Sequence, residues 1–214
     1  MSELIEISTF TIKNNPPAPP PLVLSALKTL AVAPDIVAVY FGAHVESPTT
    51  YTSVARWSSK AARDAFVHNP SFEDWRTSFT KDIDTLLVLA SKGSDGDSGG
   101  DPAVPLEAPC TEIFTSFGAE DDYLENRLKP FAKAIASADP PGLVGAGFAD
   151  EFAPVRHVGV DEPKAKISVL LQGWNSKADH EAQKGDGKVI DKHIHLVRSG
   201  RKSVSLFHVH FEKL

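Results

Sequence analysis

The sequence lacks the residues that mark several protein classes. It has a single cysteine, Cys110, among 214 residues, which excludes an intrachain disulfide. No apolar run reaches the roughly 18 residues that a membrane-spanning helix needs. The first residues show no basic stretch leading into an apolar one, as a signal peptide would. We therefore expect a soluble protein of the cytoplasm.

Positive charge is also scarce. The formal net charge is −6, and Lys and Arg form no run along the chain. Nucleic-acid backbones and anionic membranes bind basic surfaces, so we expect neither as a partner. Apolar residues make up 42% of the sequence and charged residues 23%, which is typical of a folded chain with a proper core.

Gly, Ser, Asp and Pro gather in one segment, residues 93–108. This segment has no periodicity and little apolar surface, so we interpret it as a flexible linker. It divides the chain into a first repeat at residues 1–92 and a second repeat at residues 109–214.

The two repeats resemble each other in the order of their patterns. The best match aligns Trp57-Ser58-Ser59-Lys60-Ala61 with Trp174-Asn175-Ser176-Lys177-Ala178. In each copy a strand runs into Trp, and a Ser or Asn cap then starts a helix. The remaining patterns predict the order β-α-β-β-α-β for each repeat, which is the ferredoxin-like arrangement. The expected strands are 5–10, 36–45, 53–57 and 85–90 in the first repeat, and 112–117, 143–152, 170–174 and 203–211 in the second.

The fold class predicted from these patterns is α+β. A ferredoxin-like sheet carries its helices on one face, yet the other face here is also apolar and must be covered. Packing the two sheets face to face would cover both and give an intramolecular pseudo-dimer. Further homodimerisation stays open.

Trp57-Ser58-Ser59, followed by His68-Asn69-Pro70-Ser71-Phe72, resembles the dimeric α/β-barrel proteins of the antibiotic-biosynthesis-monooxygenase type. The second repeat keeps Trp174-Asn175-Ser176 but has no His-Pro-Phe piece. The glutamate that precedes the Trp in the family is replaced in both copies, by Ala55 and Gln172. The resemblance covers nearly the whole chain outside the linker and implies a tandem barrel fold.

The resemblance implies two kinds of function. One is a cofactor-independent enzyme that acts on a hydrophobic aromatic or polyketide-like metabolite, through monooxygenation or cyclisation of a carbanion formed by a base. The alternative is a non-catalytic small-molecule-binding or stress-responsive protein with the same cavity. Either way the partner is a small hydrophobic molecule, and we expect no cofactor.

Four residues are candidates for catalysis. His208 and His210 share one face of the final strand, because side chains alternate along a strand. The other face carries Phe207 and Val209 and would suit the helix layer, which places both imidazoles toward the cavity. One of them would act as the base. Tyr40 or Arg56 would donate a hydrogen bond to the substrate, although two histidines at a strand end also suit simple hydrogen bonding.

Five more residues are candidates for binding substrate: Trp57, Trp174, Tyr51, Gln172 and His68. The two Trp residues also suit core anchors where strand meets helix. His68 falls on the family's helix motif, where haem-handling members use a His, but a His at a helix end before a Pro explains it as well. The histidines show no ligand spacing of the usual zinc type, so we expect no metal and no haem.

Overall fold

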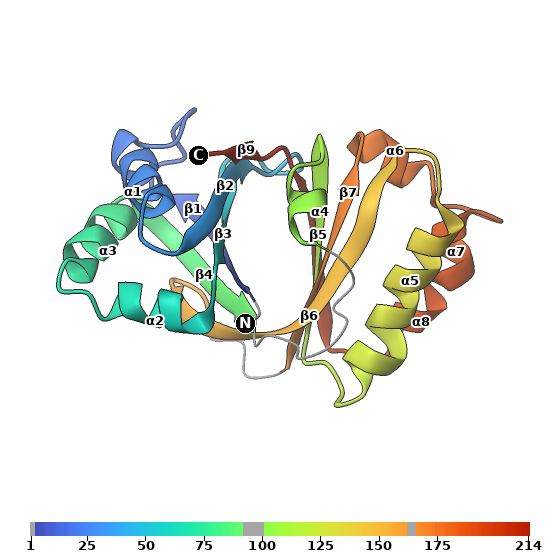
Figure 1. Ribbon diagram of the computed structural model, residues 1–214. Coiled ribbons are helices and arrows are strands. Elements are labelled where there is room, and N and C mark those ends of the chain that lie inside the picture. Colours follow the sequence, from blue (N-terminus) through green and yellow to red (C-terminus); the bar gives the residue numbers. More distant parts are fainter. Residues whose placement is uncertain (1–2, 92–100, 162–165) are drawn as a thin grey trace. The chain divides into compact units, whose positions relative to one another are not determined.

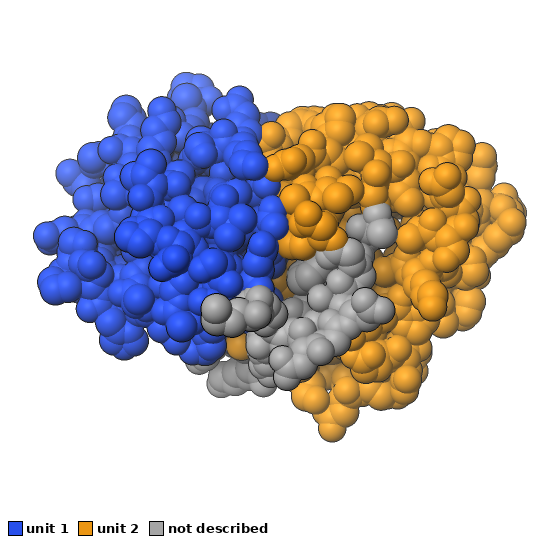
Figure 2. Space-filling view, viewed as in Figure 1, with its two compact units in different colours: residues 1–93, 154–162, 212–214 blue, residues 94–153, 163–211 orange. Residues whose placement is uncertain are grey.

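The computed structural model describes residues 3–91, 101–161 and 166–214. The chain forms two compact units (Figure 2). Unit 1 contains residues 1–93, 154–162 and 212–214, and unit 2 contains residues 94–153 and 163–211.

Unit 1 is an antiparallel sheet with helices on one face (Figure 1). Its strands lie in the order β4-β1-β3-β2-β9. The elements are β1 (Leu4–Ile12), α1 (Pro21–Ala31), β2 (Ile36–Ala43), β3 (Thr50–Trp57), α2 (Lys60–Val67), α3 (Phe72–Thr80), β4 (Ile83–Ser91) and β9 (Glu212–Lys213).

The core of unit 1 lies between this sheet and its helices. Phe10, Leu27, Phe79 and Leu86 are at most 4% exposed and belong to one apolar cluster. The even-numbered residues of β1 face the helices, because side chains alternate along a strand. Glu6 therefore points beneath the helices, on the same face as Phe10.

Unit 2 repeats the plan with strands in the order β8-β5-β7-β6. Its elements are α4 (Ala103–Leu106), β5 (Cys110–Phe117), η1 (Leu124–Leu128), α5 (Lys129–Ala138), β6 (Leu143–Val158), β7 (Ile167–Trp174), α6 (Lys177–Glu181), α7 (Val189–His193), α8 (His195–Arg198) and β8 (Ser203–Val209). Strand β6 continues beyond Ala153 into unit 1. The helix predicted after β5 is present as one π-helical turn followed by α5. Its apolar stripe, which includes Tyr123, Leu128 and Ile135, is buried in the core.

The predicted tandem of ferredoxin-like repeats is confirmed. Both units have the strand order in which the first and third strands lie at the centre. Ser59 and Ser176 cap the helices after Trp57 and Trp174, and each hydroxyl accepts a hydrogen bond at 3.1 Å from a backbone amide three residues on. Such a cap satisfies an amide that the helix itself leaves unpaired.

The predicted linker, residues 93–108, is described by the structure only from residue 101 on. Residues 92–100 lie outside the described residues. Ala103–Leu106 forms the helix α4, and Leu106 is 1% exposed. The hydroxyl of Thr111 donates a 2.6 Å hydrogen bond to the carbonyl of Pro105. The second part of the segment is therefore packed on unit 2.

Among the described residues, no helix is both long and apolar enough to cross a bilayer. The face-to-face packing of the two sheets and a further homodimer stay predictions.

Candidate functional site

Unit 1 contains a pocket between its sheet and the helices α2 and α3. Its cavity volume is about 50 Å³. Its lining includes five aromatic residues, Trp57, Phe66, Phe72, Trp75 and Phe79. Neighbouring rings in this set lie 5.3–5.7 Å apart, in both stacked and edge-on pairs. Such a surface is suited to the flat face of an aromatic molecule.

A partly buried ion pair lies in the wall of this pocket. Arg63 of α2 donates from Nε to Glu6 Oε2 over 2.8 Å, and the two side chains are 20% and 16% exposed. Burial raises the pKa of the Glu6 carboxyl, and the Arg63 charge and hydrogen bond oppose that shift. A carboxylate that is destabilised in this way is a stronger base than one in water.

Trp57 adds an unused donor to the same wall. The residue is 1% exposed, and its indole Nε1 has no hydrogen-bond partner among the described residues. A buried N–H without an acceptor costs about 1–3 kcal/mol. An oxygen atom of a bound molecule could remove that cost.

Two arginines also line the pocket. Arg76 pairs with Glu73, yet its Nε finds no partner among the described residues, and the same holds for Arg156 Nε. Burial lowers the pKa of Arg156, and the nearby Arg76 charge lowers it further. These N–H groups favour a ligand that carries oxygen acceptors or negative charge.

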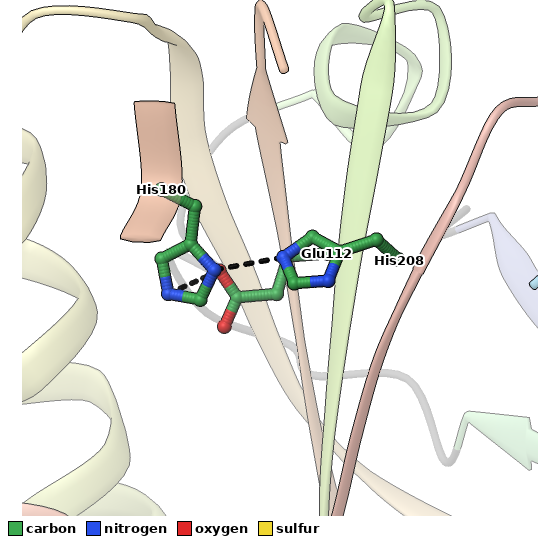
Figure 3. Close-up of side chains that lie close together, drawn as sticks. All are labelled: Glu112, His180 and His208. Carbon is green, nitrogen blue, oxygen red and sulfur yellow. Dashed lines mark hydrogen bonds and ion pairs between the residues drawn. The ribbon is translucent and has the colours of Figure 1, made fainter. Parts of the chain in front are cut away.

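Unit 2 holds a second buried polar cluster, formed by Glu112, His180 and His208 (Figure 3). The three residues come from β5, α6 and β8, and all are at most 4% exposed. His180 Nδ1 lies 2.7 Å from His208 Nε2, and His180 Nε2 lies 3.4 Å from Glu112 Oε2. Trp174 Nε1 donates to that same carboxylate oxygen over 3.0 Å.

One arrangement of protons satisfies the hydrogen bonds of the cluster when both imidazoles are neutral and Glu112 is a carboxylate. His208 Nε2–H donates to His180 Nδ1, which leaves the proton of His180 on Nε2, facing the Glu112 carboxylate. The Trp174 indole completes the shell of the carboxylate. The opposite tautomer of His180 would direct a lone pair at a carboxylate oxygen, which is unfavourable.

The two clusters occupy equivalent positions in the two repeats. Glu6 lies opposite Ala55 in β3, and Glu112 lies opposite Gln172 in β7, in each case two residues before the Trp. The glutamate absent from the Trp-bearing strand is thus matched by one on the neighbouring strand.

The partners of these glutamates differ. Arg63 and His180 each stand four residues after the capping Ser. Ala90 of β4 lies opposite Glu6, whereas His208 of β8 lies opposite Glu112.

The predicted orientation of His208 is wrong. Its ring lies under α6, on the helix face of the sheet, because it shares that face with Glu112. Phe207 and Val209 are buried on the opposite face instead. Both faces of this strand end are buried, so apolar residues there do not identify the helix side.

The other predicted catalytic residues do not join His208. His210 is exposed, with Nδ1 2.7 Å from the carbonyl oxygen of Pro109. Tyr40 and Arg56 belong to unit 1 and lie on the sheet face opposite the helices. Arg56 directly precedes Trp57, which faces the helices, and Tyr40 pairs with Val54 on the same face as Arg56. Arg56 donates to Glu3 Oε2 at 2.8 and 3.0 Å.

The predicted binding residues divide between sites. Trp57 lines the unit 1 pocket. Gln172 and Trp174 belong to the Glu112 cluster, and Gln172 Nε2 is buried without a partner among the described residues. Tyr51 packs in the core, 5.6 Å from the ring of Phe41. His68 is exposed at the end of α2 and contacts the carbonyl oxygen of Asp64.

Sequence reasoning missed four residues that form these clusters: Glu6, Arg63, Glu112 and His180. The signal available in the sequence was a single charged residue at the same place in each of two strands, Glu6 in β1 and Glu112 in β5. Taking 5–10 and 112–117 as equivalent strands offsets the repeats by one residue, and the two glutamates then do not align.

Comparisons with known proteins agree on the fold. No protein-family profile matches the chain, and no curated protein matches it. An anthrone oxidase-like protein of known structure is 13% identical, with a TM-score of 0.69, over 100% of this chain and 93% of its own. A proposed monooxygenase from Lactobacillus acidophilus NCFM is 12% identical, with a TM-score of 0.56, over 99% and 94%. Another, from Fusobacterium nucleatum subsp. nucleatum, is 9% identical, with a TM-score of 0.59, over 99% and 94%.

Identities this low establish shared fold and nothing finer. The matches span both repeats of this chain, which agrees with the tandem arrangement found in the two units. The chain shares its tandem fold with these three proteins.

Proposed function

We propose that unit 1 binds a hydrophobic aromatic metabolite with oxygen substituents and oxidises it without a cofactor. The observation that carries the proposal is one pocket lined by Glu6, whose pKa is raised, by Trp57, whose N–H has no partner among the described residues, and by several aromatic rings. Base, donor and apolar walls are what deprotonation of an acidic phenol or diketone requires.

Glu6 is the base in this proposal, in place of the histidine expected from the sequence. It takes a proton from a carbon that is conjugated with a carbonyl, directly or through an aromatic ring, and the electron pair moves toward that oxygen. The indole N–H of Trp57 and the guanidinium of Arg63 stabilise the negative charge that develops there. The carbanion then gives its electrons to dioxygen and forms a C–O bond, and Glu6 returns its proton to the resulting peroxide. Cleavage of the O–O bond with loss of the second hydrogen of that carbon leaves a carbonyl and releases water.

The size of the pocket sets a condition. Apolar cavities of about 150 Å³ hold a benzene molecule, and this cavity is about 50 Å³. A polycyclic substrate therefore has to displace aromatic side chains of α2 and α3. Phe66, Phe72 and Trp75 are each only partly buried, so they can move outward without opening the core.

The names of the similar structures point the same way. One is an anthrone oxidase-like protein and two are proposed monooxygenases, and all three cover this chain almost completely. These names support oxidation over cyclisation of the same carbanion.

The second candidate function is binding without turnover. The small cavity favours it, because a site that is closed by its own aromatic residues resembles a packed core. Catalysis and binding differ in one respect, namely whether the Glu6 carboxylate is needed for product formation or only for affinity.

Anthrone in air-saturated buffer is a suitable probe. Oxidation to anthraquinone consumes one dioxygen and releases one water, so an oxygen electrode and product absorbance measure it independently. We expect Glu6→Gln to lower the rate by about 10²–10⁴-fold, the usual contribution of a general base. Glu112→Gln is the matched control, since it removes the equivalent carboxylate of the other repeat.

Each outcome has a clear reading. Equal losses in the two variants would contradict a base role for Glu6. Tight binding of anthraquinone-2-sulfonate without anthrone oxidation would favour the binding protein.

The cytoplasmic location stays a prediction.

A further inference from the structure

The Glu112 cluster in unit 2 has a composition that the proposed oxidation does not use. Two imidazoles and a carboxylate each offer one ligand atom, and these atoms all lie within 4.8 Å of one another. We propose that Glu112, His180 and His208 form a site for a divalent transition-metal ion of the zinc type.

The charge of the cluster supports a cation. In unit 1 the buried Glu6 carboxylate has the permanent charge of Arg63 beside it. In unit 2 the equivalent position holds His180, which is uncharged when it acts as acceptor for His208. The Glu112 carboxylate is 4% exposed, and a divalent ion bound to it would stabilise its charge in this buried position.

The differences between the repeats also support it. Glu112 in unit 2 corresponds to Glu6 in unit 1. The two positions that contact this glutamate from the helix and from the neighbouring strand are both histidine in unit 2, where His180 corresponds to Arg63 and His208 to Ala90. A structural core position rarely needs an imidazole in place of alanine. Two changes at facing positions turn an ion pair into three ligands.

Neighbouring side chains hold the proposed ligand Glu112 in position. Trp174 Nε1 fixes one carboxylate oxygen of Glu112 over 3.0 Å, and Gln172 lies opposite Glu112 in the neighbouring strand. Partners of this kind hold metal-binding carboxylates in position. Imidazole with carboxylate suits zinc, cobalt or iron and is a poor set for magnesium or calcium.

Metal binding requires the cluster to rearrange. Glu112 faces Nε2 of His180 and His208 faces its Nδ1, so the carboxylate has to move toward the nitrogen that binds the ion. His180 Nδ1 and His208 Nε2 lie 2.7 Å apart, a hydrogen-bond distance. Two nitrogens bound to a tetrahedral zinc lie about 3.3 Å apart, so the rings have to separate by about 0.6 Å. The proton between them moves to the far nitrogen of His208, and His180 Nδ1 already presents a lone pair.

Cobalt is the first probe, because its visible d–d absorption reports on its ligands. After chelator treatment, the full chain should bind one Co²⁺, and Zn²⁺ should displace it. Mg²⁺ should not compete. Zn²⁺ should raise the thermal midpoint of the protein, since it binds only the folded cluster.

Variants then locate the ion. His208→Gln should weaken Zn²⁺ binding by at least about 100-fold. His210→Gln is the control, because it makes the same substitution at an exposed histidine, and it should leave Zn²⁺ binding unchanged. His180→Arg copies the ion pair of unit 1, so it should keep the fold while losing the metal and the thermal shift.

Unchanged Co²⁺ binding in His208→Gln and His180→Arg, or no binding by the original chain, would overturn the proposal. The cluster would then be a hydrogen-bonded chain within the core. Anthrone oxidation depends on Glu6 and not on these residues, so the metal site and the proposed activity can fail independently.

Discussion

Glu6 and Glu112 take the same place in the two repeats, yet their neighbouring indoles behave differently. Trp174 Nε1 donates to Glu112, whereas Trp57 Nε1 has no partner among the described residues. Arg63 binds Glu6 through the carboxylate oxygen Oε2, the atom that in Glu112 accepts from the indole. The indole thus binds the glutamate in unit 2 and does not bind it in unit 1.

The first prediction compares the two indoles. Trp57→Phe and Trp174→Phe remove similar volumes from nearly identical positions, but only the second removes a hydrogen bond to a charged group. Trp174→Phe should therefore cost about 1.5–3 kcal/mol more in free energy of unfolding. Urea unfolding of both variants measures this difference. Equal costs would mean that the Trp57 indole already has an acceptor, such as an ordered solvent molecule.

The sequence predicted the fold well because the signals were local. Alternating strands, the Trp-Ser segments and the capping residues fix the order of elements in each repeat. These patterns need only neighbours within a few residues. The strands expected at 112–117 and 203–211 therefore overlap β5 and β8.

The sites were harder to predict, for two physical reasons. Strand faces were ambiguous, since His208 and Phe207 point to opposite faces that are both buried, so hydrophobicity does not distinguish them. Register was the other reason, because a slip of one residue reverses every side chain of a strand. Glu6 and Arg63 are 57 residues apart, and only the tertiary fold brings them together.

A second prediction concerns the pH dependence of the proposed oxidation. A base works in its deprotonated form, so the rate should rise with pH through the pKa of Glu6. Burial raises this pKa above the ordinary value of 4.5, so the inflection should lie above that value. Initial rates of anthrone oxidation across pH test it. In Glu6→Gln the residual rate should lack this inflection, and an unchanged profile would exclude Glu6 as the titrating group.

A third prediction concerns stability and His44. Burial lowers the pKa of this imidazole from 6.5 to about 4, while Glu46 opposes the shift. The side chain is held neutral against Thr52, with Nε2 2.8 Å from Oγ1. The unfolded chain therefore takes up the proton first as pH falls. The stabilising effect is full above about pH 6.5 and is lost as pH falls from there toward about 4.

The expected size is about 1–3 kcal/mol in free energy of unfolding across that window. His44→Gln should remove this part of the pH dependence, which urea unfolding at several pH values would show. His68→Gln is the control, because His68 is exposed at a helix end. If the two variants keep the same pH dependence as the original chain, His44 is not the responsible group.

The last prediction tests whether the aromatic residues close the unit 1 pocket. Phe72 begins α3, and its ring lies 5.7 Å from the rings of both Phe66 and Trp75. Aromatic pairs contribute about 0.5–1.5 kcal/mol each, so Phe72→Ala should ease opening by roughly 1–3 kcal/mol. Affinity for anthraquinone-2-sulfonate should then rise by roughly 5- to 100-fold. Quenching of the fluorescence of Trp57 and Trp75, which both line the pocket, measures it. Leu124→Ala, a partly buried position of the unit 2 core, should leave the affinity unchanged. Weaker binding in Phe72→Ala would mean that this ring holds the ligand directly and does not act as a cover.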